Sequence, residues 1–198
     1  MGGRPWVEPL TLEGTVVRLE PLSMEHVPGL TAVGLDAELW RWTLNTIQTP
    51  GDMRAYVEMA IAAAVAGTEV PYATVELETG KVVGSTRFLS IEPHHRRLEI
   101  GYTWIAPPWQ RSAVNTDAKL LMLSHAFEAL GLERVELKTD RLNDASRRAI
   151  LRLGATEEGT LRSHMLCASG RRRDSVYYSI LRAEWPAAKQ RLERRSSS

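Results

Sequence analysis

A polar segment, residues 110–116, lies directly before the clearest amphipathic helix of the sequence. Apolar residues of that helix recur at spacings of three and four, which places them on one face: Leu120, Leu123, Phe127 and Leu130. The first turn of a helix offers unpaired backbone N–H groups and the positive end of the dipole, and both favour phosphate. Arg111 adds a permanent positive charge. The segment could therefore bind phosphate, or it could be a helix start capped by Asn115 or Thr116 with no ligand.

Glu99 lies in a stretch, residues 97–105, whose alternation predicts a strand. One face would carry Leu98, Ile100, Tyr102 and Trp104, and the other Glu99, Gly101 and Thr103. A glycine inside a strand often marks a bulge or the close approach of another group. The Glu99 carboxylate is a candidate proton acceptor. The alternative is an ion pair with an arginine of a neighbouring strand, such as Arg87 or Arg97.

Composition favours one globular domain over the 198 residues, of which 43% are hydrophobic and 25% charged. The net charge of +1 and the lack of a basic stripe with interleaved aromatics argue against nucleic-acid binding. The single cysteine, Cys167, excludes an internal disulfide framework and fits a reducing cytoplasm. No signal peptide or membrane span is expected. We expect a cytoplasmic protein without a membrane partner, with an N-terminal arm over residues 1–10 and a disordered tail over 189–198.

Periodicity along the chain predicts alternating strands and helices. Strands are expected at residues 16–20, 72–77, 82–89, 97–105, 134–138, 160–166 and 172–181. Helices are expected at residues 24–34 and 50–66, from 115 or 116 to 130, and at 143–153, the last capped by Asn143 and ended by Gly154. This order predicts a mixed α/β (α+β) domain whose first half is largely antiparallel.

Three motifs in this order resemble those of the GNAT superfamily of N-acetyltransferases. They are LEIGYTW (98–104) with PPW (107–109), QRSAVNT (110–116), and NDAS (143–146) with LGA (153–155). Together they resemble the branch that includes the bacterial ribosomal-protein N-terminal acetyltransferases, over nearly the whole chain. The resemblance implies the GNAT fold, a mostly antiparallel twisted sheet of about seven strands, splayed at its centre and flanked by about four helices.

The resemblance also implies acetyl-CoA as co-substrate and no metal. The cradle for its pyrophosphate would be Gln110, Arg111, Ser112, Ala113, Val114, Asn115 and Thr116. The backbone of Trp104 and Ile105 would bind the pantetheine arm and polarise the thioester. The side chain of Asn143 would contact the pantetheine amides, and Ser146 would hydrogen-bond both the cofactor and the departing thiolate.

The implied reaction is direct attack of an amine on the thioester. The amine must lose a proton, and Glu99 is the expected acceptor because burial in such a cleft raises the pKa of a carboxylate. Ser146 is preferred as the proton donor to the thiolate, although a tyrosine, Tyr177 or Tyr178, is the more usual acid in the superfamily. The acceptor would be a protein N-terminus or a small amine. Many relatives dimerise, so a homodimer is one expectation.

Ala113 departs from the family pattern, which usually has glycine at this position. If the backbone there needs a positive φ, alanine strains the loop by about 1 kcal/mol. This departure keeps open an alternative function, a catalytically weak CoA- or nucleotide-binding module.

Other reactive residues have simpler explanations. His94 and His95 lack further ligands at metal-binding spacing. The arginines at 171–173 predict a solvated basic turn, with contact to an acidic substrate or the CoA 3′-phosphate as the alternative. The WRW segment at 40–42 predicts packing, with a role in acceptor recognition as the alternative. Cys167 is expected to be a passive thiol, since no base is evident beside it.

Overall fold

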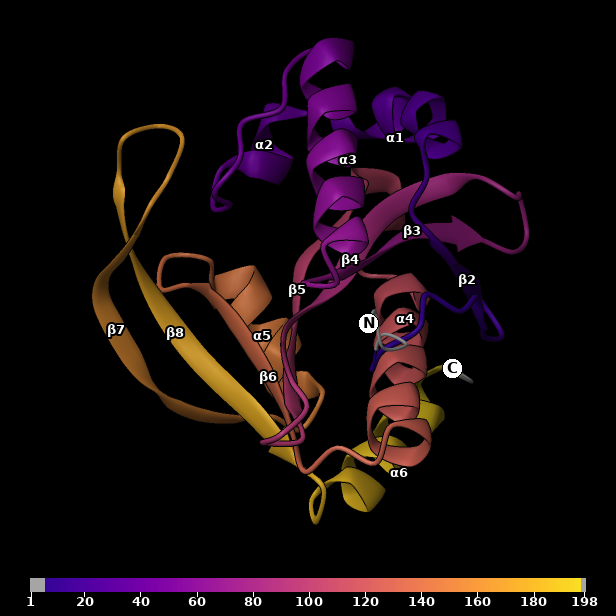
Figure 1. The fold of residues 1–198 in the computed structure, drawn as a ribbon, viewed down its shortest axis with the longest axis vertical. Helices are drawn as coiled ribbons and strands as arrows, with labels where there is room; N and C mark the ends of the chain where they lie inside the picture. The colour runs from indigo at the N-terminus through magenta and orange to yellow at the C-terminus, as the bar shows by residue number, and fades with distance from the viewer. Residues whose placement is uncertain (1–5, 197–198) are drawn as a thin grey trace.

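The computed structural model describes residues 6–196, whose strands form one sheet (Figure 1). The strands are β1 (Leu12–Glu13), β2 (Val17–Pro21), β3 (Val70–Glu76), β4 (Val82–Glu92), β5 (Arg97–Ile105), β6 (Arg134–Asp140), β7 (Thr156–Leu166) and β8 (Arg172–Leu181). Their spatial order is β1-β2-β3-β4-β5-β6-β8-β7. Only β5 and β6 run parallel, and every other neighbouring pair of described strands is antiparallel.

Helices cover both faces of this sheet. They are α1 (Val27–Gly34), α2 (Ala37–Trp40), α3 (Pro50–Val65), α4 (Val114–Ser124), α5 (Asp144–Arg152) and α6 (Trp185–Ser196). Tyr72 and Ala73 are neighbours on β3 but belong to different buried clusters, because successive strand side chains point to opposite faces. The first three helices cover the face of Ala73, and α4, α5 and α6 pack on the face of Tyr72 (Figure 1). The predicted mixed α/β fold is confirmed, with eight strands and six α-helices among the described residues rather than about seven and four.

Local signals start and stop the helices as the sequence predicts in two cases. Thr49 caps α3: its hydroxyl accepts from the Asp52 N–H at 3.1 Å, and the Asp52 carboxylate accepts from the Thr49 N–H at 2.9 Å. This reciprocal pair satisfies N–H groups that a helix start otherwise leaves unbonded. At α5 the Asn143 side chain caps the helix, and Gly154 follows its end with φ of +97°, a conformation that glycine adopts at little cost.

The C-terminal segment differs from the prediction. Residues 189–196, expected as disordered tail, form the second half of α6, and residues 197–198 lie outside the described part. α6 buries Trp185, Ala188 and Leu192 on one face, and Trp185 stacks on Phe127 with ring centroids 5.4 Å apart. The many charged residues between these positions hid an amphipathic pattern. Of the predicted arm at 1–10, residues 1–5 lie outside the described part, and Val7 is buried.

Candidate functional site

β5 and β6 separate part-way along their length. They pair only at Arg97–Arg134, Leu98–Val135 and Glu99–Glu136, although β5 continues to Ile105 and β6 to Asp140. Beyond Glu99, the edge of β5 that faces β6 therefore makes no ladder with it. The splayed centre that the resemblance implies is present, and it opens at Glu99.

A β-bulge at Tyr102 changes which way the second half of β5 faces. Ser85 pairs with Trp104 but Arg87 pairs with Gly101, so β5 has one extra residue, and Tyr102 takes a φ of +49°. An extra residue exchanges the two faces of the strand beyond it. Trp104 consequently packs on Trp40, with ring centroids 5.3 Å apart, in the cluster under α1–α3. The prediction that Trp104 shares a face with Leu98 is wrong for this reason.

Glu99 is a buried carboxylate at the point where the strands part. Its side chain is 4% exposed and accepts a hydrogen bond from the Lys138 ammonium at 2.9 Å. The partner is neither Arg87 nor Arg97, both of which pair with other glutamates. Burial raises the pKa of Glu99 above its usual range, and the Lys138 charge offsets part of that increase. A Cβ at Gly101 would come within 3.0 Å of the carboxylate, so the glycine lets Glu99 occupy this position.

The loop before α4 differs in detail from the prediction. α4 begins at Val114 with Ala113 as its N-cap residue, and neither Asn115 nor Thr116 caps it. Ala113 has φ of −69°, so it is unstrained, and the positive φ of the loop, +63°, belongs to Arg111. The reason for expecting a weakened loop at Ala113 is therefore wrong. The N–H groups of Ala113, Asn115 and Thr116 bond to no described residue, which leaves donors available for an anion.

Two side chains of this loop attach it to the structure around it. The Gln110 amide donates to the Ile105 carbonyl at 2.9 Å, at the end of β5. The Ser112 hydroxyl donates to the Trp109 carbonyl at 2.6 Å and accepts from the Val114 N–H at 3.3 Å. The expected phosphate cradle is thus fixed to the strand that carries Glu99.

The start of α5 lies at the far end of β6. Asn143 Oδ1 accepts from the Ser146 N–H at 3.0 Å, as its predicted capping role requires, and the Ser146 side chain is half-buried. The two candidate tyrosines face opposite ways. Tyr178 is fully buried on the α5 side, and its hydroxyl donates to Glu157 at 3.1 Å. Tyr177 is half-buried on the face of Glu99, with its ring centroid 5.7 Å from the Lys138 nitrogen.

A lysine that the sequence pattern did not single out lies beneath the bulge. Lys119, on α4, is 4% exposed and forms no ion pair with any described residue. Its ammonium donates to the hydroxyls of Thr103 at 2.6 Å and Thr86 at 3.2 Å. Burial lowers the pKa of Lys119 to about 7. Lys119 therefore carries a full positive charge only below neutral pH.

The arginines at 171–173 do not form a solvated turn. Arg171 bonds to the buried Asp140 carboxylate and lies over the Trp42 ring at 5.4 Å. Arg173 is 6% exposed, and only Arg172 of the three is exposed. The expectation of a basic surface turn is wrong for Arg171 and Arg173, because alternation along β8 directs Arg173 toward the face of Glu99.

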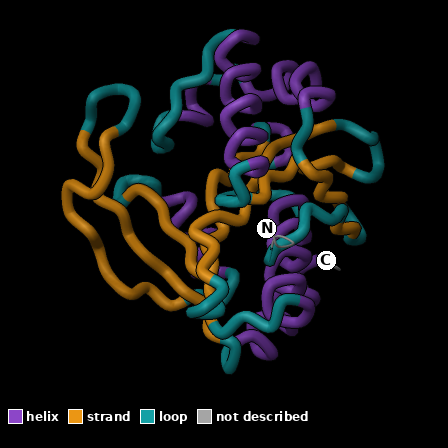
Figure 2. Tube along the Cα trace, in the orientation of Figure 1, coloured by secondary structure: helices purple, strands orange, loops and turns teal. Residues whose placement is uncertain are grey.

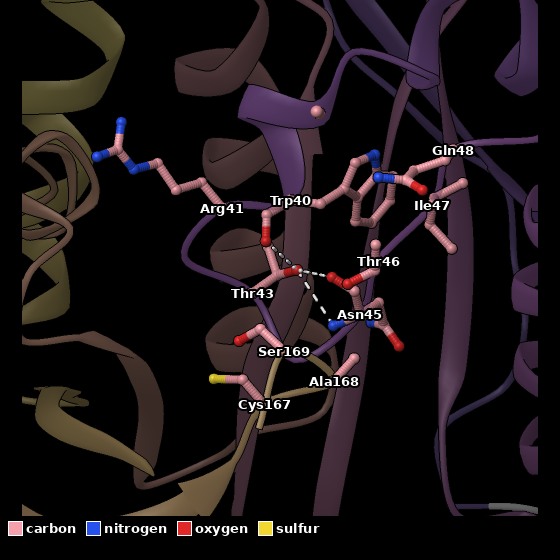
Figure 3. A pocket seen from close by; sticks show the side chains of 11 residues that line it. Trp40, Arg41, Thr43, Asn45, Thr46, Ile47, Gln48, Cys167, Ala168 and Ser169 are labelled. Atoms are coloured by element: carbon pink, nitrogen blue, oxygen red, sulfur yellow. Dashed lines mark hydrogen bonds between the residues drawn. The ribbon is translucent and has the colours of Figure 1, made fainter. Parts of the chain in front are cut away.

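A pocket lies between the loop after α2 and the tip of the β7–β8 hairpin (Figure 3). The hairpin reaches across to that loop (Figure 2), and the Ala168 N–H donates to the Leu44 carbonyl at 3.0 Å. The lining includes Trp40, Thr43, Asn45, Cys167 and Ser169. Thr43 holds the loop through its hydroxyl, which donates to the carbonyls of Trp40 and Asn45. The WRW segment therefore borders a pocket as well as packing.

Two further classes of site find no support within residues 6–196. His94 and His95 are exposed in the turn between β4 and β5, and no group of three His, Cys, Asp or Glu residues there could hold a metal ion. No helix of that part of the chain is long and apolar enough to cross a bilayer.

Known proteins share this fold and parts of this sequence. A Bacillus subtilis protein named "Putative ribosomal N-acetyltransferase YdaF" is 35% identical over 113 residues, 57% of this chain and 61% of its own length. A crystal structure of an acetyltransferase from T. thermophilus is 38% identical and covers 96% of this chain and 98% of its own, with a TM-score of 0.88. Mycobacterium smegmatis RimJ, solved with CoA-disulfide, has a TM-score of 0.81 at 24% identity and 94% coverage of both chains.

The first of these relatives carries the name of the branch that the sequence motifs resemble, and this chain spans less than two thirds of its length. The family described as "Acetyltransferase (GNAT) domain" matches residues 17–156, which is well over half of the chain and includes β5, the loop before α4 and α5. The protein therefore belongs to the GNAT family of N-acetyltransferases.

Proposed function

We propose that the protein transfers the acetyl group of acetyl-CoA to a primary amine, a protein N-terminus or a small molecule, by direct attack on the thioester. The observation that carries this proposal is the separation of β5 from β6 beginning at a buried glutamate. The unpaired edge of β5, including Trp104 and Ile105, offers backbone donors to the pantetheine arm. The unbonded N–H groups of residues 113, 115 and 116 fit the pyrophosphate.

Acetyl-CoA supplies an activated acetyl thioester, and the protein supplies proton transfer and positioning. Glu99 accepts the proton of the attacking amine, directly or through water, because burial has brought its pKa closer to neutral pH. Asn143 positions the start of α5 beside the gap, and Ser146 hydrogen-bonds the departing thiolate. Tyr177, rather than the inward-facing Tyr178, is the tyrosine that could supply a proton instead. The reaction takes place in the cytoplasm.

The name of the YdaF relative favours ribosomal-protein N-termini among the acceptors. The alternative of a catalytically weak CoA-binding module rested on strain at Ala113. Because Ala113 has an ordinary helical φ of −69°, no observation favours that alternative.

The proposal is tested by thiol release from acetyl-CoA against a panel of small amines and N-terminal peptides. The variant is Glu99→Gln, and the matched control is Glu92→Gln, at the exposed end of β4. We expect amine-dependent release that drops by about 100-fold or more in the Glu99 variant, the usual contribution of a general base, and is unaffected in the control. Acetyl-CoA binding without release on any acceptor would refute the transferase proposal. Equal turnover in both variants would exclude Glu99 as the base.

A further inference from the structure

Arg173 is buried on the face of Glu99 without a bonding partner. Its side chain belongs to β8 and the residue is 6% exposed. The Nε–H is fully buried and makes no hydrogen bond, and the terminal nitrogens form no hydrogen bond or ion pair with any described residue. A guanidinium carries five N–H donors, and burying such a charge unpaired is costly. This pattern is expected where a ligand completes the site.

The neighbouring charges are already matched with one another. On this face Lys138 pairs with Glu99, and Arg171 pairs with Asp140. Arg173 interacts electrostatically with both carboxylates but bonds to neither. Two carboxylates thus face three cations, and one positive charge remains.

Arg173 lies between the candidate proton acceptor and the pocket. It interacts electrostatically with Glu99 on one side and with Cys167, which lines the pocket, on the other. The loop before α4 leads into a helix on the opposite face of the sheet, since α4 packs on Leu98 rather than beside Glu99. An anion at Arg173 would therefore come from the acceptor rather than from the CoA phosphates.

We propose that Arg173 binds a carboxylate of the acceptor, so that the preferred substrate is an amine carrying a carboxylate close to the reacting nitrogen. A carboxylate matches the planar fork of the guanidinium with two parallel hydrogen bonds. The carboxylate belongs either to a free amino acid or to an acidic side chain next to a peptide N-terminus. This inference rests on the proposed acetyl transfer, with Glu99 receiving the proton of the same acceptor.

The test compares acceptors that differ only in the carboxylate. One series pairs free amino acids with their amides, and the other pairs amidated peptides carrying aspartate or asparagine at the second position. We expect wild-type kcat/KM to favour the carboxylate by about 10- to 100-fold in one series, which identifies the source. Arg173→Gln should bring that ratio close to one, Arg173→Lys should retain part of it, and Arg172→Gln, on the opposite face of β8, should retain all of it.

A wild-type ratio near one in both series, or a ratio unchanged in Arg173→Gln, would overturn the proposal. Thermal unfolding confirms that each variant is folded, and Arg173→Lys replaces the glutamine variant if that one is not. Calorimetric binding of N-acetylated amino acids and peptides against their amides separates this inference from the proposed function. Carboxylate-selective binding that Arg173→Gln abolishes, in a protein that releases no thiol, would support the anion site and refute acetyl transfer. Equal binding of acids and amides by wild type would refute the anion site.

Discussion

Replacing Lys119 by methionine should change how the stability of the protein depends on pH. Lys119 is buried under the β5 bulge with two threonine hydroxyls and no carboxylate among the described residues. Methionine has a similar length and keeps the apolar contacts of the lysine stem. The hydroxyls of Thr86 and Thr103 also contact each other at 2.8 Å, so both remain hydrogen-bonded without the ammonium.

The magnitude follows from the pKa of Lys119, which burial lowers from 10.5 to about 7. Between these two values the unfolded chain binds a proton that the folded chain does not, so stability rises with pH at about 1.4 kcal/mol per pH unit. Below the lower value both states are protonated and the folded protein carries the full penalty, about 5 kcal/mol. From about pH 7 to about pH 9, wild type should gain about 2 kcal/mol from this residue.

Urea unfolding of wild type and Lys119→Met over that range measures the difference directly. The variant should be the more stable protein near neutral pH, and its advantage should shrink steadily toward pH 9. Lys81→Met, in the exposed turn between β3 and β4, serves as the control for removing a lysine. The range stops near pH 9 because burial raises the pKa of Tyr72, so tyrosine ionisation in the unfolded chain destabilises the folded protein at higher pH.

Parallel stability curves for wild type and Lys119→Met would refute this reasoning. They would mean that the folded protein holds the Lys119 proton as tightly as the unfolded chain does. A variant that is less stable throughout, with the difference independent of pH, would show that the ammonium contributes net hydrogen bonding instead of a desolvation penalty.

Three further results are expected. Acetyl transfer should be lost as pH falls through the raised pKa of Glu99, because the neutral acid cannot accept a proton, and Lys138→Met should move this loss to higher pH by removing the charge that lowers that pKa; a pH–rate profile of kcat/KM that does not move would contradict the ion pair. Ala113→Gly should leave calorimetric acetyl-CoA affinity unchanged and reduce stability by about 0.5 to 1 kcal/mol, because φ is already helical; tighter binding would show that the loop needs closer backbone approach. Trp185→Ala should cost about 3 to 5 kcal/mol in urea unfolding because the ring is buried on Phe127, whereas a loss no larger than that of the exposed Gln190→Ala would mean that α6 is not docked in solution.

The sequence predicted those parts of the site that depend on a few adjacent residues. The capping role of Asn143 and the strand that carries Glu99 follow from short-range hydrogen bonding and alternation, and both are present. The polar loop before α4 was placed correctly for the same reason. Its position with positive φ was not, since Arg111 rather than Ala113 adopts it. Local chemistry indicates that a turn exists there, but the direction of the chain on both sides determines which residue takes the unusual conformation.

Tertiary structure alone decided the partners and the burial of the charged groups. Lys138 is 39 residues from Glu99, and the two meet because β6 pairs beside β5. The bulge at Tyr102 turned Trp104 to the other face, and no alternation pattern shows an extra residue in advance. Arg173 sits in a run of three arginines that suggests a solvated turn, yet the register of β8 buries it. The sequence thus determined the family, the elements and the residue types of the site. The fold determined which charges lie together out of water, because pairing and desolvation depend on segments far apart in the chain.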